Sequence, residues 1–327
     1  MKKLLLLLFI GIVGIGTAQN VNIPDANFKA YLVGNAAINT NGDAEIQLSE
    51  AAAFNGGINC QAMNISDLTG IEAFTNLETL KCSNNPLTSL DVSQNTALTQ
   101  LDCIDNQLTS LDVNGANALE SLYCRDNQLT NLDITQNTAL SWLSCANNQL
   151  TNLDVTQNTA MWMLNCDNNQ ITSLDVSHNT SLSSSSYYGN QLTCLNVKNG
   201  NNSNFTSFYA LNNPNLTCIE VDDVAYSTAN WTDIDTQTSF STACNNDCSV
   251  GINEANTPSL SIYPNPSSTG LIQLNTSIVN SDINVYSIEG KQINFTQSNN
   301  VIDISENEKG VYLVSIEGVV TRYVYQE

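Results

Sequence analysis

A unit of 21 residues repeats almost unchanged through the middle of this 327-residue chain, from Leu77 to Leu182. One cysteine falls in each step of the repeat: Cys82, Cys103, Cys124, Cys145 and Cys166. A short fixed period is typical of a solenoid, in which each unit forms one coil and buries its apolar face only against the neighbouring coils. The repeat therefore predicts a stack of coils rather than a single closed core for this part of the chain.

The residues of the unit indicate what kind of coil it forms. The unit reads L-x-x-L-x-C-x-x-N-x-L-T-x-L-D-V-x-x-N-T-x, which fits the leucine-rich-repeat template with cysteine at the third leucine. Side chains alternate along a strand, so Leu80 and Cys82 should point inward, while Thr79, Lys81 and Ser83 should point outward. The expected fold is mainly β: a leucine-rich-repeat solenoid with a short helical N-terminal cap.

The repeated cysteines are expected to be buried free thiols that fill the core as a ladder. A degenerate first coil adds one member, and the full set is Cys60, Cys82, Cys103, Cys124, Cys145 and Cys166. A metal or redox site is disfavoured, because the spacing gives no C-x-x-C pair and no histidine lies nearby. Four other cysteines are the candidates for disulfide bonds, with three pairings left open: Cys194, Cys218, Cys244 and Cys248.

Two polar positions also recur in the regular coils. Asn85 and its equivalents are expected to turn inward and to bond backbone groups of the bends above and below. Asp91 and its equivalents should point outward, where stacked carboxylates repel one another. We expect solvent and the Thr88 or Asn95 side chains to reduce this repulsion, because no coil supplies the several convergent oxygens that a hard cation requires.

The ends of the chain differ from the array. Residues 1–18 are predicted to form a secretory signal peptide, since Lys2 and Lys3 precede an apolar run and a small-residue cleavage site. That run is too short to span a bilayer and no other stretch comes close, so no transmembrane segment is expected. The expected organisation continues with a helical cap at 19–57, the solenoid at 58–217, a C-terminal cap at 218–250, a linker at 251–258 and a last domain at 259–327. Short alternating apolar runs between turn signals predict that this last domain is a small immunoglobulin-like β-sandwich.

A loop in the N-terminal cap resembles the calcium loop of an EF-hand. Its oxygen-bearing side chains stand at the ligand positions of that motif: Asn39, Asn41, Asp43, Glu45 and Glu50. The loop departs from the motif at position 1, which is Asn instead of Asp, and at position 6, which is Ala instead of Gly. Two interpretations stay open, a Ca²⁺ site and a polar loop that joins two cap helices.

Two resemblances to known families follow from these patterns. The repeat unit resembles the coils of internalin-type bacterial surface proteins, which implies a curved binding scaffold used in adhesion. The tail resembles the type A C-terminal sorting domain of the type IX secretion system. Its motif residues are Tyr263, Pro264, Asn265, Pro266, Gly290, Gly310 and Tyr312. This second resemblance implies export by the type IX machinery and a secreted or outer-membrane surface location, whereas the family's final basic pair is reduced here to Arg322.

The outward strand positions are free to carry function, and several hold large side chains. The candidate partner-binding residues on this concave face are Tyr123, Arg125, Trp142, Trp162, Met163, Tyr188 and Tyr209. Aromatic residues and Arg are enriched at interface cores, which favours binding of a protein on a host, bacterial or matrix surface. The alternatives are a carbohydrate-binding adhesin that uses these aromatics and a structural cell-surface component.

Other function classes are disfavoured by composition and motifs. The formal charge of −22 repels nucleic acid phosphates. The single histidine, His178, occupies a repeat position, and no catalytic triad, phosphate loop or zinc motif occurs. The chain is therefore not expected to be an enzyme.

Overall fold

The computed structural model describes residues 19–244, 248, 262–263, 268–274, 283–287, 291–298, 301–316 and 319–325. The chain divides into two units, Met1–Val250 and Gly251–Glu327, and each is described by itself. The predicted signal peptide at 1–18 and the predicted linker at 251–258 lie outside the described residues. Both of these assignments stay predictions, as do the other domain boundaries.

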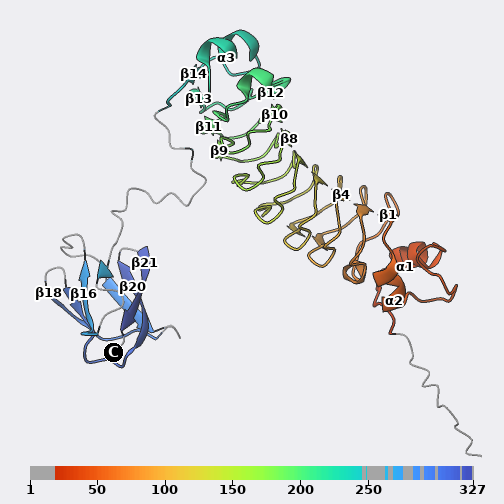
Figure 1. Ribbon diagram of the computed structural model, residues 1–327, viewed down its shortest axis with the longest axis horizontal. Helices are drawn as coiled ribbons and strands as arrows, with labels where there is room; N and C mark the ends of the chain where they lie inside the picture. The colour runs from red at the N-terminus through yellow and green to blue at the C-terminus, as the bar shows by residue number, and fades with distance from the viewer. Residues whose placement is uncertain are drawn as a thin grey trace, which may run out of the picture. The chain divides into compact units, whose positions relative to one another are not determined.

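The first unit is a solenoid whose coils stack side by side along a parallel sheet (Figure 1). In order, the sheet contains β1 (Gly57–Asn59), β2 (Thr79–Lys81), β4 (Gln100–Asp102), β6 (Ser121–Tyr123), β7 (Trp142–Ser144), β8 (Met163–Asn165), β10 (Ser184–Ser186) and β12 (Ser207–Tyr209). Each strand pairs with its neighbours in repeat register, so that Leu80 lies opposite Leu101 and Leu101 lies opposite Leu122. Equivalent side chains therefore form columns across the sheet, which is the solenoid predicted from the period.

Shorter ladders run along another side of the coils. One pairs β3 (Ser89–Asp91) with β5 (Ser110–Asp112). The other joins β9 (Ser173–Asp175), β11 (Cys194–Asn196), β13 (Cys218–Glu220) and β14 (Ser239–Ser241). Leu90, Leu111 and Leu174 at the centres of these strands are buried, so they form a second inner wall facing the same core.

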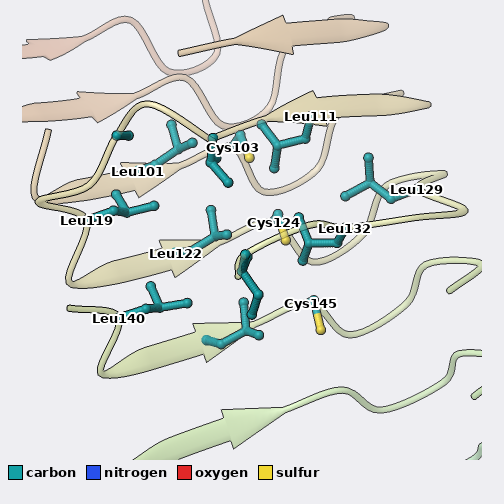
Figure 2. Packing of buried hydrophobic residues seen from close by; sticks show 14 of the residues in the cluster. Leu101, Cys103, Leu111, Leu119, Leu122, Cys124, Leu129, Leu132, Leu140 and Cys145 are labelled. Atoms are coloured by element: carbon teal, nitrogen blue, oxygen red, sulfur yellow. The ribbon is translucent and has the colours of Figure 1, made fainter. Parts of the chain in front are cut away.

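The core between the walls is built from leucine and cysteine columns, as Figure 2 shows for Leu101, Cys103, Leu122 and Cys124. All six repeat cysteines are free and buried. Burial raises the pKa of the Cys124 thiol well above its ordinary value, and the thiol of the preceding coil, Cys103, adds to the shift. A thiol kept protonated is a poor nucleophile and a poor metal ligand. The ladder therefore acts as packing.

The asparagine columns hold neighbouring coils together. The Asn127 amide donates to the carbonyl oxygens of Cys103 and Cys124, at 3.0 and 3.1 Å. Its own oxygen accepts from the backbone N–H of Leu108 at 3.0 Å. These bonds satisfy backbone groups that a tight bend leaves without a partner. Asn85 makes bonds of the same kind, so the asparagines turn inward as expected.

A second asparagine column shows that one expectation is wrong. Asn95 is fully buried and donates to the carbonyl oxygens of Ile71 and Phe74, at 2.8 and 2.9 Å, so it does not shield Asp91. Asp91 instead accepts from the backbone N–H of Ser93 at 2.8 Å. The same local bond recurs at Asp112, Asp133, Asp154 and Asp175. Each carboxylate thus closes its own turn, a role that aspartate commonly plays.

Helices and aromatic rings cover the two ends of the solenoid. The N-terminal cap contains α1 (Ala26–Val33) and α2 (Leu48–Ala53), and Asp25 caps α1 by accepting two backbone N–H groups. Short 3₁₀ turns follow at η1 (Ile71–Ala73) and η2 (Asn202–Asn204). At the other end, α3 (Val224–Asn230) brings Trp231 onto Phe208, with the rings stacked 4.1 Å apart.

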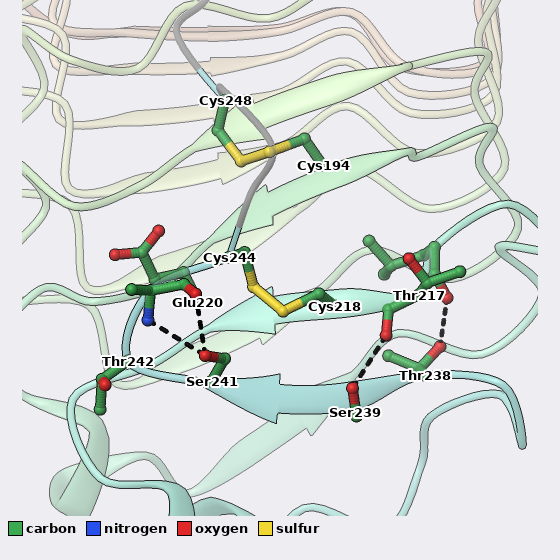
Figure 3. The surroundings of a disulfide bond; sticks show 12 residues. Cys194, Thr217, Cys218, Glu220, Thr238, Ser239, Ser241, Thr242, Cys244 and Cys248 are labelled. Atoms are coloured by element: carbon green, nitrogen blue, oxygen red, sulfur yellow. Dashed lines mark hydrogen bonds between the residues drawn. A yellow bond between two sulfur atoms is a disulfide. The ribbon is translucent and has the colours of Figure 1, made fainter.

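Two disulfides tie the C-terminal cap to the last coils (Figure 3). Cys194 pairs with Cys248 and Cys218 pairs with Cys244, with Cα atoms 5.3 and 6.0 Å apart. The sequence identified the four residues and left their pairing open. The structure selects one of the three arrangements.

The described residues of the second unit form two antiparallel sheets. One joins β15 (Ile262–Tyr263), β16 (Leu271–Leu274), β19 (Val301–Asp303) and β18 (Thr296–Ser298). The other joins β17 (Ile283–Ser287), β20 (Gly310–Ile316) and β21 (Val319–Tyr325). Buried residues from both sheets, such as Ile272 and Val285, form one small core. The immunoglobulin-like type of this sandwich stays a prediction.

Candidate functional site

The outward side chains of the eight-stranded sheet form the surface that we call the sheet face. Residues at the first and third positions of each strand point to this side, because the central residue of each strand is buried. Parallel pairing in register brings equivalent positions of adjacent coils next to one another. A substitution in one coil therefore changes one known position on the sheet face.

Four large side chains meet near the middle of the sheet face, and we call them the aromatic cluster: Tyr123, Trp142, Trp162 and Met163. The Trp142 ring lies 5.6 Å from Tyr123 and 5.0 Å from Trp162, and both contacts are edge to face. Met163 lies directly opposite Trp142 in the ladder. Trp162 remains 41% exposed, so the cluster is held together by its own contacts while offering an apolar ring to solvent.

A hollow of about 380 Å³ lies beside the aromatic cluster, and we call it the sheet hollow. Its lining residues are Met163, Leu164, Asn165, Asp167, Ser184, Ser185, Ser186, Tyr188, Ser207 and Tyr209. Three consecutive serines form β10, which lies between β8 and β12. Ser184 and Ser186 are the two that point outward, and each lies opposite a larger side chain, Met163 and Tyr209, so the surface sinks between those two residues.

One carboxylate lines the sheet hollow. Burial raises the pKa of Asp167 above its ordinary value, against hydrogen bonds from Ser186, Tyr188 and Asn165 that lower it. The backbone N–H of Tyr188 donates to Asp167 at 2.9 Å. Nearby, the Tyr188 hydroxyl accepts from the side-chain amide of Asn212 at 2.6 Å. Asp167 is therefore incompletely solvated, and the described residues that donate hydrogen bonds to it are uncharged.

The predicted partner-binding residues divide into three groups. Tyr123, Trp142, Trp162 and Met163 come together, including Trp162, which lies one residue before the outward strand positions. Tyr188 and Tyr209 stand at the sheet hollow, 38% and 45% exposed. Arg125 forms an ion pair with the adjacent Asp126 at 2.6 Å.

Sequence reasoning did not single out Asp167 or the serines of the sheet hollow. Ser183 to Ser186 interrupt the leucine spacing of the repeat, and Asp167 occupies one of many outward positions. The available signal was the register of β10, which sets Ser184 opposite Met163 in one column and Ser186 opposite Tyr209 in another. Ser83 bonds Gln61 and the Asp102 side chain of β4, and it is only 3% exposed.

The candidate calcium loop is closed by its own hydrogen bonds. One Glu50 oxygen accepts from the backbone N–H groups of Thr40 and Asn41, at 2.7 and 3.1 Å. The other accepts from the backbone N–H of Gln47 at 3.1 Å. Asn39 donates to the carbonyl oxygen of Asp43. A bound ion would take the place of these N–H groups as the partner of Glu50, and calcium binding stays a prediction.

The other candidate ligands of that loop are also hydrogen-bonded or ion-paired. Asp43 accepts from the backbone N–H of Glu45 at 2.7 Å, and Asn41 donates to Asp43 at 2.9 Å. Glu45 forms an ion pair with Lys29 on α1 at 2.7 Å. Within the described residues, no group of three or more His, Cys, Asp or Glu side chains is arranged to hold a metal ion.

The sorting-motif residues lie in the second unit. Tyr263 ends β15, while Gly310 and Tyr312 belong to β20, where the Tyr312 hydroxyl donates to the carbonyl oxygen of Glu308. The remaining motif residues lie outside the described part of the chain: Pro264, Asn265, Pro266 and Gly290.

Known proteins match both parts of the chain. Residues 261–325 match the family described as the secretion system C-terminal sorting domain. A stretch of 83 residues, 25% of this chain, is 36% identical to internalin J from Listeria monocytogenes serotype 4b (strain F2365). The same stretch spans 9% of the length of internalin J.

Two of the solved structures that are similar to this chain are internalins. Internalin C2 from Listeria monocytogenes strain 4b F2365 is 17% identical, with a TM-score of 0.47, covering 68% of this chain and 98% of that one. The functional domain of internalin J from Listeria monocytogenes, which includes a cysteine ladder, is 20% identical, with a TM-score of 0.35. That match covers 95% of this chain and 100% of the other.

Both resemblances predicted from the sequence are confirmed: the array is similar to internalin repeats, and the tail is a type IX sorting domain. The sorting domain directs the protein to the cell surface through type IX secretion, which confirms the predicted localisation. Among the helices that the structure describes, none is long and apolar enough to cross a membrane.

Proposed function

We propose that this secreted surface protein binds a protein partner through the sheet face, with the aromatic cluster at the centre of the contact. The observation that carries the proposal is the chain of ring contacts from Tyr123 through Trp142 to Trp162, which leaves Trp162 41% exposed. The sorting domain supports it, because a protein sent to the cell surface meets partners there.

The aromatic cluster has the chemistry of an interface centre. Trp and Tyr are the residues that most often dominate binding energy, and they act best when neighbours exclude water around them. Met163 adds a flexible apolar side chain that can adapt to a partner's shape. The rings already fix one another through edge-to-face contacts, so little side-chain entropy is lost when a partner binds.

The solenoid keeps this surface in place. The backbone of each coil is bonded to the next through the sheet and through the buried asparagines, as for Asn148 and the carbonyl oxygens of Cys124 and Cys145. Functional residues on rigid strands are held more accurately than residues on loops. The binding proposal therefore rests on a preformed surface that requires no folding on contact.

The test is binding by matched variants of the full chain. Immobilised protein captures cell-surface proteins, and affinity for each captured protein is then measured with the Tyr123→Ala/Trp162→Ala variant. We expect affinity to fall by about a hundredfold, since loss of a hot-spot aromatic costs about 2 kcal/mol or more. The Asn131→Ala/Asn152→Ala variant, which changes exposed residues at the repeat position of Ser110 in β5, should bind like the unchanged protein.

Three results separate the competing functions. Loss of protein binding only in the aromatic variant supports the proposal. Binding to a glycan array that disappears in the same variant, without any protein partner, would favour the carbohydrate-binding adhesin. Equal binding by both variants would contradict a role for the sheet face and favour a structural surface component.

A further inference from the structure

The sheet hollow differs from the rest of the sheet face in both shape and charge. β10 contributes only serines, and the larger side chains of Met163, Tyr188 and Tyr209 line the hollow beside them. The volume of about 380 Å³ lies near the lower end of the ~300–1,000 Å³ typical of small-ligand sites. A recess of this size suits one long side chain rather than a helix or strand.

Charge at the sheet hollow is one-sided. Asp167 contributes a carboxylate, and among the described residues that line the hollow none is Lys or Arg. The whole chain carries a formal charge of −22, so the surrounding field is also negative. A group that enters beside Asp167 is favoured if it is positively charged and disfavoured if it is an anion.

The walls suit the stem of a basic side chain. Tyr188 and Tyr209 are 38% and 45% exposed. The Asn212 side-chain amide donates to the Tyr188 hydroxyl at 2.6 Å, and this bond fixes the Tyr188 side chain. Met163 supplies an apolar wall on the other side of the serines. Lys and Arg bury an apolar stem while placing a charged head on a carboxylate, and tyrosine rings attract the cation.

We propose that the sheet hollow binds an Arg or Lys side chain presented by the protein partner, with Asp167 receiving its charge and Tyr188 and Tyr209 flanking its stem. The inference deepens the proposed function and rests on it, since it names the chemistry of the partner at one point of the sheet face. A basic partner segment also matches the negative charge of the chain as a whole.

A methionine label provides a direct readout of the sheet hollow. The chain has four methionines. Among them, Met163 lines the hollow, whereas Met63 lies in the first coil, 39% exposed, and serves as an internal reference. The full chain carrying ¹³C-methyl methionine is titrated with Ac-Gly-Arg-Gly-amide. The same peptide with citrulline, which has the shape of arginine without its charge, is the matched probe.

The expected result is a saturable shift of the Met163 methyl signal with the arginine peptide. The apparent affinity for the citrulline peptide should be lower by a factor of about ten or more. Asp167→Asn should reduce the response to arginine by a similar factor. Asp91→Asn is the control, because it removes one charge from another side of the coils while its side-chain oxygen can still accept from Ser93. The Met63 signal should stay constant throughout.

Several outcomes would overturn the inference. These are the absence of a Met163 shift with arginine, equal shifts with arginine and citrulline, and an unchanged response in Asp167→Asn. A Met163 shift with methyl glycosides that exceeds the shift with arginine would assign the hollow to sugars instead. If partner affinity falls in Tyr123→Ala/Trp162→Ala but not in Asp167→Asn, the proposed function stands and the basic side chain is excluded.

Discussion

Asn127 shows at the scale of one residue how the coils are joined. Its amide bonds carbonyl oxygens of two successive coils, and its oxygen bonds the Leu108 N–H, in a position only 9% exposed. Asn127→Ala leaves those groups buried without partners, so we expect a loss of about 2–3 kcal/mol in the free energy of unfolding. Urea denaturation measures it. Asn131→Ala, an exposed neighbour in the same coil, should change stability by less than about 0.5 kcal/mol, and equal losses would contradict the role of the column.

Asp167 makes a prediction about pH. Burial raises its folded pKa above the ordinary value of 3.8, so the folded chain binds this proton more readily than the unfolded chain. The contribution of Asp167 to stability therefore falls as pH rises from 3.8 through the raised pKa. Asp167→Asn should increase the melting temperature at pH 7 and leave it nearly unchanged at pH 3. A lower melting temperature at pH 7 would show that the carboxylate stabilises the fold.

At the scale of one structural element, the coil around β10 reverses the sizes of two inward residues, with the small one first and the large one second. Ser185 stands where the regular coils have leucine, and Tyr187 stands where they have cysteine, and both are buried. Tyr187 also packs on Phe208, with ring centres 5.8 Å apart. The total volume of the coil is thus kept while its distribution changes, which cores tolerate well.

This exchange predicts coupled mutations. Ser185→Leu should overpack the coil by about 1–3 kcal/mol, and Tyr187→Cys should leave a cavity that costs about 3 kcal/mol. The double variant should lose at least 1 kcal/mol less than the sum of the two, because each change relieves the other. A double-mutant cycle by chemical denaturation gives the coupling. Strict additivity would show that the two side chains do not share one space.

The N-terminal cap loop makes the second prediction at this scale. Although burial raises the Glu50 pKa, bonds from Gln47, Asn41 and Thr40 outweigh it, and the folded pKa is below 4.5. Glu50 therefore stabilises the fold above pH 4.5, and this contribution is lost as pH falls through the folded pKa. Glu50→Gln should lower the melting temperature at pH 7, and the difference should shrink as the pH falls below 4.5 through the folded pKa.

Calcium is tested in the same experiment. The predicted site should raise the melting temperature of the unchanged protein when Ca²⁺ replaces chelator, and Glu50→Gln should abolish that rise. An unchanged melting temperature with Ca²⁺ would contradict the calcium prediction, and the polar-loop interpretation would then explain Glu50 fully.

For the whole molecule, the sequence predicts those features that follow from the 21-residue period of the repeat. The inward columns from Leu80 to Leu164 follow from alternation and register alone, as do the outward positions of Tyr123 and Trp142. Features that depend on neighbouring side chains across coils were not predictable in this way. The contact between Trp142 and Trp162 requires particular ring orientations.

Other features escaped prediction because they depend on the path of the chain. The disulfide between Cys194 and Cys248 joins residues that are 54 positions apart, a separation that no periodic pattern encodes. Asn95 looked like a surface neighbour of Asp91, but it bonds the bend of the preceding coil instead. The sheet hollow arises where the repeat fails, so the period alone gave no reason to expect it.

The central claim, that the sheet face meets the partner, is tested most directly by site-specific photo-crosslinking on the full chain. A photoreactive residue replaces Ser121, which lies opposite Trp142 on the sheet face, or Asn131, which is exposed on another side of the same coil. We predict a crosslinked cell-surface protein from position 121 that is absent or much weaker from position 131. Equal crosslinking from both positions, or crosslinking from position 131 alone, would contradict the account.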